Sequence, residues 1–240
     1  MQNLIARKHN LARADDWMVA HDLTPSVPVA ERLDRENPFV GMRSALRNRN
    51  VMLATLITFL FICGEAGTVT FLTLQLTRVA PVPLAAAITL SGISGITGWL
   101  GQVAWGRLSD RAGRRPILAA LAIGWVAAML ACIWISSVAT ASVILLGWGL
   151  VRNAGSPVLY ALCLDSLPKG ASSGLGLTIG VSFGLSGVTI PLISGWLIAH
   201  DGFAANYIML AAIGGSSLIP IGLLRETAGA RISKAKPAAG

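Results

Sequence analysis

The stretch Gly106-Arg-Leu-Ser-Asp-Arg-Ala-Gly-Arg-Arg-Pro116 joins two long apolar segments of the chain. A connection this short predicts a tight hairpin between two neighbouring helices. Gly106 permits close backbone approach, and Gly113 permits a left-handed turn. Asp110 is placed to pair with an arginine or to lie at a helix N-terminus, and Pro116 suits the first turn of the next helix. On these residues alone, the stretch is a positively charged reverse turn.

The composition of the chain is that of a membrane protein. Apolar residues make up 54% of the 240 residues and charged residues 12%, with a mean hydropathy of +0.66. Globular domains carry roughly a quarter charged residues, so this inventory excludes a water-facing surface and predicts a polytopic α-helical membrane protein. The cysteines lie in apolar runs without metal-binding spacing, which predicts small buried side chains. They are Cys63, Cys132 and Cys163.

Six apolar segments are long enough to cross a bilayer, which takes about 20 residues. We therefore expect an all-α membrane protein with six transmembrane helices. The division between the third and fourth helices falls near Ser136, Ser137 and Thr140. The predicted spans are residues 51–76, 84–105, two within 117–163, 174–199 and 204–224.

The positive residues predict the orientation of these spans. If the N-terminus is cytoplasmic, 17 of the 19 lysines and arginines fall in inner segments, Arg78 in an outer loop and Arg152 inside a span. This split follows the positive-inside rule and accounts for the net charge of +8 without a nucleic-acid partner. We expect a multi-pass protein of the plasma (bacterial inner) membrane with both termini cytoplasmic. The inner positive residues are Arg7, Lys8, Arg13, Arg32, Arg35, Arg43, Arg47, Arg49, Arg107, Arg111, Arg114, Arg115, Lys169, Arg225, Arg231, Lys234 and Lys236.

The chain divides into four predicted parts. They are a polar cytoplasmic tail or inter-half linker at 1–36, a basic interfacial helix at 37–50, a six-helix transmembrane bundle at 51–224 and a basic cytoplasmic tail at 225–240. The second part opens with Asn37-Pro38 and sets apolar residues against arginines, as an amphipathic helix at a membrane surface does. A plain linker with basic flanks is the alternative.

The loop between the second and third spans resembles the signature of the major facilitator superfamily, Gly-x-Leu-x-Asp-Arg-x-Gly-Arg-Arg. The resemblance covers residues from about 37 to 226 and implies one six-helix half of a fold with about twelve spans. In the family this loop helps to latch a cytoplasmic gate, which implies a gating role for Asp110, Arg111 and Arg114. The matching residues are Gly106, Leu108, Asp110, Arg111, Gly113, Arg114 and Arg115.

The fifth span has a glycine-rich face that is similar to the antiporter motif on helix five of the family. Glycines at about every fourth residue allow another helix to pack closely, and Pro191 leaves the carbonyl of Gly187 without its helical donor. Ile190 and Ser194 depart from the antiporter motif, so the sequence favours a helix-packing seam over proton antiport. The seam comprises Gly176, Gly180, Gly184, Gly187, Pro191 and Gly195.

Two features point to different halves of the fold, and the C-terminal half is the one expected. The basic segment ending Leu46-Arg47-Asn48-Arg49-Asn50 is similar to the connector that precedes helix seven and favours the C-terminal half, whereas the complete loop motif favours the N-terminal half. Substrate sites of such transporters lie between the halves. Transport is therefore expected to need a homodimer, a partner half or a further portion of the same polypeptide, as for a truncated or split gene product.

Two charges fall near the middle of predicted spans, Glu65 in the first and Arg152 in the fourth. Each costs about 2.5–3.5 kcal/mol at the bilayer centre, so neither is expected to face lipid. By helical periodicity each shares its face with polar or aromatic residues, and the resemblance implies that both helices line a central cavity. The candidate substrate or proton pathway is Glu65, Arg152, Thr58, Thr68, Trp148 and Ser156.

Two interpretations of these charges stay open. In the first, Arg152 holds an anionic group of a solute while Glu65 carries a coupling proton. In the second, the two residues form a structural ion pair that lowers the cost of insertion. Trp148 likewise serves either as packing or as a substrate platform.

The sequence predicts secondary active transport, by symport or antiport, of a small organic solute, with an anion as the candidate class. The alternative is a non-transporting membrane interaction or assembly protein derived from a truncated transporter. No cofactor, metal or enzymatic activity is expected, since the sequence has no helix-borne metal set, no Ser/His/Asp arrangement and no phosphate-cradling Gly-x4-Gly-Lys-Ser/Thr loop. The expected partners are the lipid bilayer, the solute, protons and a second transporter half.

Overall fold

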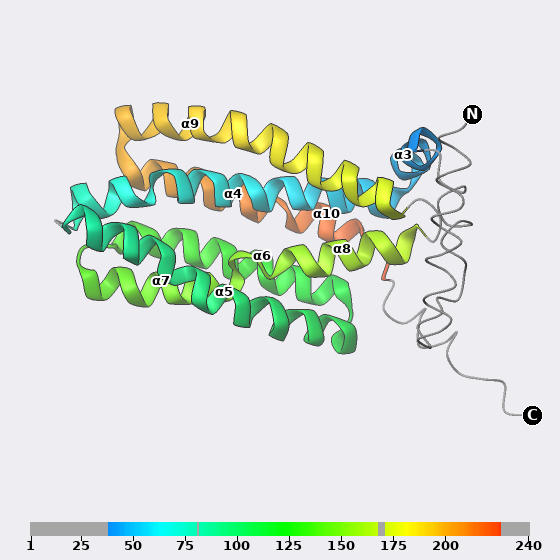
Figure 1. The fold of residues 1–240 in the computed structure, drawn as a ribbon, viewed down its shortest axis with the longest axis horizontal. Helices are drawn as coiled ribbons and strands as arrows, with labels where there is room; N and C mark the ends of the chain where they lie inside the picture. Colours follow the sequence, from blue (N-terminus) through cyan, green and yellow to red (C-terminus); the bar gives the residue numbers. More distant parts are fainter. Residues whose placement is uncertain (1–37, 81, 168–170, 227–240) are drawn as a thin grey trace, which may run out of the picture.

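The computed structural model describes residues 38–80, 82–167 and 171–226. The tail predicted at 1–36, and the tail predicted at 225–240 apart from its first two residues, lie outside the described residues. Across the described ranges every regular element is a helix, and the long helices form one bundle (Figure 1). The elements are α3 (Pro38–Arg47), α4 (Arg49–Val79), α5 (Leu84–Ala112), α6 (Arg114–Ala131), the 3-10 turn η1 (Cys132–Trp134), α7 (Val138–Arg152), α8 (Gly155–Ser166), α9 (Ala171–Ser216) and α10 (Leu218–Leu223).

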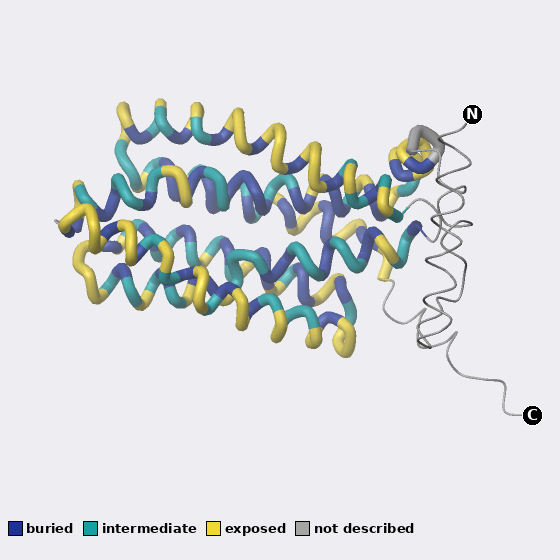
Figure 2. The backbone as a smooth tube through the Cα atoms, in the orientation of Figure 1, coloured by how far each residue is buried: buried dark blue, intermediate teal, exposed yellow. Residues whose placement is uncertain are grey.

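Helix α4 lies in the middle of the bundle in the view of Figure 1, between α9 and the pair formed by α5 and α7. It packs along α9, while α5 packs along α7 and α6 contacts both α9 and α7. Exposed residues lie mainly on the outer faces of the helices (Figure 2), as expected for a bundle whose surface meets lipid. The largest fully buried side chains include Ile57, Leu72, Leu118, Leu121, Trp125, Leu145 and Trp148.

Five segments of the described chain are long and apolar enough to cross a membrane. The last of them covers 53 residues, Ala171–Leu223. At about 1.5 Å per residue a straight helix of that length would reach about 80 Å, far beyond the roughly 30 Å hydrocarbon core. Gly202 interrupts it with non-helical angles, φ 83° and ψ 179°, and α9 turns back on itself in Figure 1. The prediction of an all-helical fold built from long apolar helices is confirmed.

The predicted division between the third and fourth apolar segments is confirmed at residues 135–137. Ser137 Oγ accepts the backbone N–H of Thr140 at 3.2 Å, and Thr140 Oγ1 accepts the backbone N–H of Ser137 at 2.9 Å. This reciprocal capping provides partners for N–H groups that the start of α7 would otherwise leave free. The chain therefore ends one helix and starts the next at this stretch.

The start of α4 differs from the boundary predicted for the interfacial helix at 37–50. Asn48 Oδ1 accepts the backbone N–H groups of Asn50 and Val51 at 3.0 and 3.3 Å. Asn48 is therefore an N-cap, and residues 49 and 50 belong to α4 rather than to the interfacial helix. Helix α3 covers most of the predicted interfacial segment, and both Met42 and Arg43 are exposed on it. Its position at a membrane surface stays a prediction.

Candidate functional site

The two mid-span charges lie where helical geometry brings them inside the bundle. Glu65 is near the middle of α4, which runs from residue 49 to 79. Arg152 is the last residue of α7, at the middle of the apolar segment Val138–Ser166. Helix α8 follows after a two-residue turn, and its Pro157 has no N–H to donate to the carbonyl of Asn153. The break thus places Arg152 at a helix end within the segment.

Glu65 and Arg152 form an ion pair. Arg152 donates from Nε to Glu65 Oε1 at 2.9 Å, and its Nη2 lies 2.9 Å from the same oxygen. Its Nη1 donates to Ser94 Oγ at 3.0 Å. All three guanidinium nitrogens are engaged, yet each partner of the ion pair keeps 18% of its side chain exposed. The structure therefore joins the two predicted charges in a site that is only partly closed.

Close packing of α5 on α7 brings Ser94 to the arginine. Gly149 lies against the backbone carbonyl of Ser94 and the hydroxyl of Thr97, so a Cβ at Gly149 would overlap both. Thr97 Oγ1 donates to the carbonyl of Leu146 at 2.8 Å and ties the two helices at the same level. Ser94 is buried, and its hydroxyl is the second polar group, after Glu65, that fixes the guanidinium.

An aromatic cluster supports the guanidinium. Arg152 Cζ lies 4.9 Å from the centroid of the Trp148 ring, which is a cation–π contact. Trp148 packs edge-on against Trp125 with 6.0 Å between centroids, and Trp125 stacks on Phe61 at 6.4 Å. Trp148 is buried, and its indole N–H has no hydrogen-bond partner within the part of the chain that the structure describes. Trp148 therefore packs in the core and also positions the charge.

Three further pathway residues were predicted, and the hydrogen bonds of the guanidinium reach none of them. Thr58 and Thr68 are buried on α4, and each donates to a backbone carbonyl one turn earlier in its own helix. Thr68 also contacts the sulfur of Met129 at 3.1 Å. Ser156 lies in the first turn of α8. The pair and Ser94 are thus a smaller site than the predicted polar stripe.

A second cluster lies at the loop between α5 and α6. Gly113 has a φ of 99°, which confirms the predicted glycine turn. Arg114 donates from Nε to Asp165 Oδ2 at 3.0 Å, and its Nη2 lies 2.8 Å from the same oxygen. Both side chains are buried, with 5% and 4% exposed. Asp110, by contrast, is 68% exposed, and its Oδ1 lies 3.5 Å from Arg114 Nη1. Asp110 pairs with an arginine as predicted, but the buried partner of Arg114 is Asp165.

The N-terminus of α6 is held by a carboxylate from the far end of the described chain. Glu226 Oε1 accepts the backbone N–H of Arg114 at 2.9 Å, and Oε2 accepts that of Arg115 at 3.0 Å. A helix start leaves such N–H groups without partners, and its dipole favours a negative charge there. Glu226 thus lies at the helix N-terminus, the position that was one of the two predicted for Asp110. A Cβ on Gly113 would lie 2.9 Å from Glu226 Oε2, so this glycine also makes room for the carboxylate.

The remaining residues of the loop motif lie at the surface. Leu108, Arg111 and Arg115 have exposed side chains. A Cβ built on Gly106 would meet no atom within 4 Å. The close approach expected at Gly106 is therefore not made within residues 38–80, 82–167 and 171–226.

The glycine-rich face of α9 is largely unpacked in this chain. A Cβ at four of its positions would meet no described atom within 4 Å. Gly195 differs, because a Cβ there would lie 3.2 Å from the Phe71 ring, and Pro191 lies within the helix. The face predicted for helix packing is thus free over most of its length. The four open positions are Gly176, Gly180, Gly184 and Gly187.

Comparison with protein families gives a match over nearly the whole chain. The family described as Major Facilitator Superfamily matches residues 17–177 and 54–239. The chain belongs to the major facilitator superfamily. Proteins of this superfamily transport solutes across membranes, so the chain is an integral, multi-pass membrane protein of a transport family. Comparison with curated proteins gave no match.

Three side chains of this superfamily member were not predicted as parts of its sites: Ser94, Asp165 and Glu226. Ser94 carries no signal, because many other serines and threonines lie in the apolar segments. The two acids do carry one. Each ends an apolar segment on the side where arginines predominate, and such isolated acids are candidates for buried pairing.

Proposed function

We propose that this chain is one six-helix half of a secondary active transporter, with its fifth and sixth spans on either side of Gly202. The parts 171–201 and 203–223 have 31 and 21 residues, so each is long enough for the roughly 20 residues that a span needs. Six spans place both ends of the bundle on the side of the α5–α6 loop. The positive-inside rule makes that side the cytoplasm, in a plasma (bacterial inner) membrane.

The observation that carries the transport function is the Glu65–Arg152 ion pair at mid-span, with its 2.9 Å contacts. Ionisable groups at this depth are costly and commonly mark solute or proton pathways. Arg152 has two supports that do not depend on Glu65, the Ser94 hydroxyl and the Trp148 ring. A positive group held in this way suits an anionic solute. The proposed substrate class is therefore small organic anions.

Glu65 takes the coupling role in this proposal. A proton on Glu65 removes its charge and weakens its attraction to Arg152. Two guanidinium nitrogens, Nε and Nη2, are then free for a carboxylate or a phosphate, which arginine binds in a forked geometry. Anion binding is thereby linked to proton uptake, so lower pH strengthens binding. Symport follows from this linkage.

The loop cluster serves as a cytoplasmic latch in this proposal. Arg114 ties the loop to α8 through Asp165, and Glu226 ties the start of α6 to the chain after α10. These contacts support the gating role that the loop motif implies for Arg114 and its neighbour Asp110. For Arg111 the support is the motif alone, since its side chain is exposed.

A second half completes the transporter. Solute sites in folds with repeated halves lie at the interface between the halves, and small residues allow the closest helix contact there. The open glycine face of α9 provides such a surface. A copy of this chain, a separate partner or another portion of the same polypeptide supplies the opposing wall. The likeness of residues 37–50 to an inter-half connector supports assignment as the C-terminal half.

The test uses full-length protein in lipid nanodiscs and a panel of carboxylates and organic phosphates as probes. We expect wild type to bind at least one anion more tightly as pH falls. Glu65→Gln imitates the protonated state and should bind the same anion without pH dependence, whereas Arg152→Gln should not bind it. Arg78→Gln, which removes an exposed arginine, is the control. Binding that survives loss of Arg152 would refute the proposal.

All three guanidinium nitrogens of Arg152 already have partners. This observation favours one alternative, a non-transporting membrane interaction or assembly protein. In that case the pair serves only to lower the cost of inserting two charges. The alternative predicts no anion-dependent signal in the same panel. It also predicts that replacing both charges together leaves association with partner proteins intact.

A further inference from the structure

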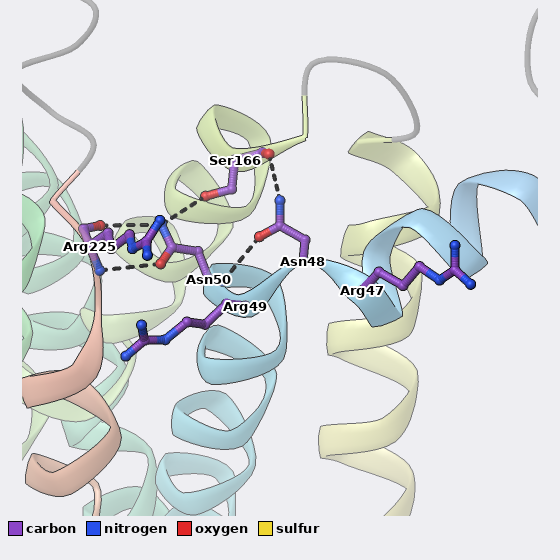
Figure 3. Close-up of a pocket in the computed structure, with 6 residues that line it drawn as sticks. All are labelled: Arg47, Asn48, Arg49, Asn50, Ser166 and Arg225. Carbon is purple, nitrogen blue, oxygen red and sulfur yellow. Dashed lines mark hydrogen bonds between the residues drawn. The ribbon is translucent and has the colours of Figure 1, made fainter.

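A recess of about 360 Å³ lies at the end of the bundle where α4 begins and α10 ends (Figure 3). Asn50 joins its walls, because Nδ2 donates to the carbonyl of Arg225 at 3.2 Å and Oδ1 accepts the N–H of Arg225 at 3.2 Å. Asn48 Nδ2 donates to the carbonyl of Ser166 at 2.9 Å. These bonds join three parts of the chain around the recess: the start of α4, the end of α8 and the residues after α10. Its lining residues are Arg47, Asn48, Arg49, Asn50, Ser166 and Arg225.

The lining of the recess is strongly basic. Three of its six residues are arginines, and none is acidic. Arg49 Nη2 donates to the carbonyl of Leu223 at 3.1 Å, which holds that side chain over the end of α10. In Figure 3 the side chains of Arg49 and Arg225 lie on the same side of Asn50, whereas Arg47 points away from both. The positive charge of the recess is therefore centred on Arg49 and Arg225.

Two acidic residues are sequence neighbours of residues that line the recess, but both have their partners at the start of α6. Glu226 follows Arg225, but both of its oxygens accept N–H groups at the start of α6. Asp165 precedes Ser166, but it pairs with the buried Arg114. Among the described residues, these two acids therefore have their partners at α6, and no acid lines the recess.

Exposed apolar side chains extend from the recess toward the middle of the bundle. On α4, Met52 and Leu56 are exposed, and helical periodicity places them on the same face as Arg49. On α10, Ile219 and Leu223 are exposed, and α10 packs against α4. A basic recess at the helix ends therefore continues into an apolar surface along two adjoining helices.

We propose that this recess binds the phosphate headgroup of an anionic phospholipid, with Arg49 and Arg225 on the phosphate oxygens. The planar guanidinium matches phosphate through paired N–H donors. The acyl chains lie along Met52 and Leu56 of α4 and along the exposed face of α10. Basic pockets between membrane helices are suited to such headgroups. A free phosphate would use the arginines alone, so the adjoining apolar surface selects the lipid.

The experiment is native mass spectrometry of full-length protein from a neutral detergent, titrated with phosphatidylglycerol or phosphatidylcholine. We expect retention of phosphatidylglycerol in preference to phosphatidylcholine. Removal of each arginine should weaken phosphatidylglycerol binding about fivefold, and Arg49→Gln/Arg225→Gln about 25-fold. Arg225→Gln alone keeps the backbone bonds to Asn50, so it tests the charge without removing a structural contact.

Arg107→Gln is the matched control, since Arg107 is an exposed arginine near the same end of the bundle but outside the recess. It should bind phosphatidylglycerol as wild type does. Equal loss in this control would overturn the site in favour of general surface charge. Equal binding of phosphatidylcholine, or full affinity in Arg225→Gln, would also overturn it. Displacement of the lipid by millimolar inorganic phosphate would identify a free-anion site instead.

Discussion

Gly101 allows α5 to lie directly against α7. A Cβ at this position would overlap the backbone carbonyl of Leu150, which belongs to α7 and moves only if that helix moves. Trp105, one turn further along α5, donates its indole N–H to the same carbonyl at 3.1 Å. This contact lies on the helix pair that also holds Ser94 against Arg152. Because Gly101 has no side chain, the two helices can pack closely and hold the geometry of the charged site.

Gly101→Ala is expected to destabilise the protein. The added methyl group meets backbone rather than a flexible side chain, and overpacking of this kind costs about 1–3 kcal/mol. Gly92→Ala on the same helix is the control, because a Cβ there meets no atom within 4 Å, and alanine favours a helix over glycine by up to about 1 kcal/mol. The measurement is the thermal unfolding midpoint in one detergent. Equal midpoints for the two variants would contradict the contact.

Glu65→Gln and Arg152→Gln are expected to lower stability when made singly, and less than additively when combined. Each single variant leaves one partner of the 2.9 Å pair without its counter-charge, whereas the double variant leaves none. The coupling energy should be about 1–3 kcal/mol, within the range for residues in direct contact. A double-mutant cycle on thermal stability measures it. Strict additivity would show that the pair is not formed in the membrane.

The sequence picked out the two mid-span charges because each is costly there, and the ion pair that the structure shows was one of the two interpretations it left open. It did not predict Ser94 or the precise partner of Arg114. Hydroxyls are common in membrane helices and their partners depend on which helices pack together. Asp165 and Asp110 were both available to Arg114 by charge, and only the three-dimensional packing shows that Asp165 is the buried one.

Helix α6 depends at its start on a residue outside the helix. Arg114 and Arg115, its first two residues, present backbone N–H groups to Glu226 at 2.9 and 3.0 Å. The residue before them is Gly113, which has no side chain to act as a cap. Glu226 therefore supplies what a serine or aspartate at that position supplies in many helices.

Glu226→Ala is expected to lower stability by about 1–2 kcal/mol, because two N–H groups and the helix dipole lose their partner. Glu226→Gln keeps one carbonyl acceptor and should lose less. Asp110→Asn is the control, since its exposed pair with Arg114 is worth less than about 1 kcal/mol. Hydrogen exchange at the amides of Arg114 and Arg115 reports the effect directly. Unchanged protection in Glu226→Ala would disprove the cap.

The lengths of the elements could be predicted more fully than their ends. The apolar runs, and the polar residues that separate them, predicted the helices α4 and α5 and the division at Ser137, because bilayer thickness constrains helix length. The break between α7 and α8 was harder to predict, since Pro157 leaves the exact point of interruption open. The early start of α4 depended on the Asn48 cap, and asparagine is common in ordinary loops as well as at helix starts.

The bundle as a whole is packed on some faces and open on others. Helix α4 is the most buried of the apolar segments, whereas the segment containing α9 is the least buried. The open glycines of α9 lie on a helix that faces outward in Figure 2. Lipid alone can cover such a face. Glycines, however, have their particular advantage where another helix packs closely, because they let the two backbones approach each other. This open face supports the proposal that the chain associates with a second transporter half.

In lipid nanodiscs we expect the mass of two chains, measured by native mass spectrometry. Gly180→Leu should shift the protein to one chain, since it fills the open face, and should leave the fold intact because a Cβ there meets no atom within 4 Å. Gly147→Leu is the control, at an equally open position on α7. One chain in the wild type would contradict self-assembly and assign the second half to another polypeptide. An unaffected Gly180→Leu dimer would place the interface elsewhere.

The Glu226 carboxylate lies 112 residues after the Arg114 amide that it accepts. At about 5–20 residues per second, a ribosome reaches this glutamate on the order of ten seconds after it has made the arginine. Helix α6 therefore enters the membrane before its cap has been synthesised. While α9 and α10 are being made, the backbone N–H groups of Arg114 and Arg115 therefore lack their Glu226 partner. Closure of that loop through Glu226 is then expected to follow the synthesis of residue 226.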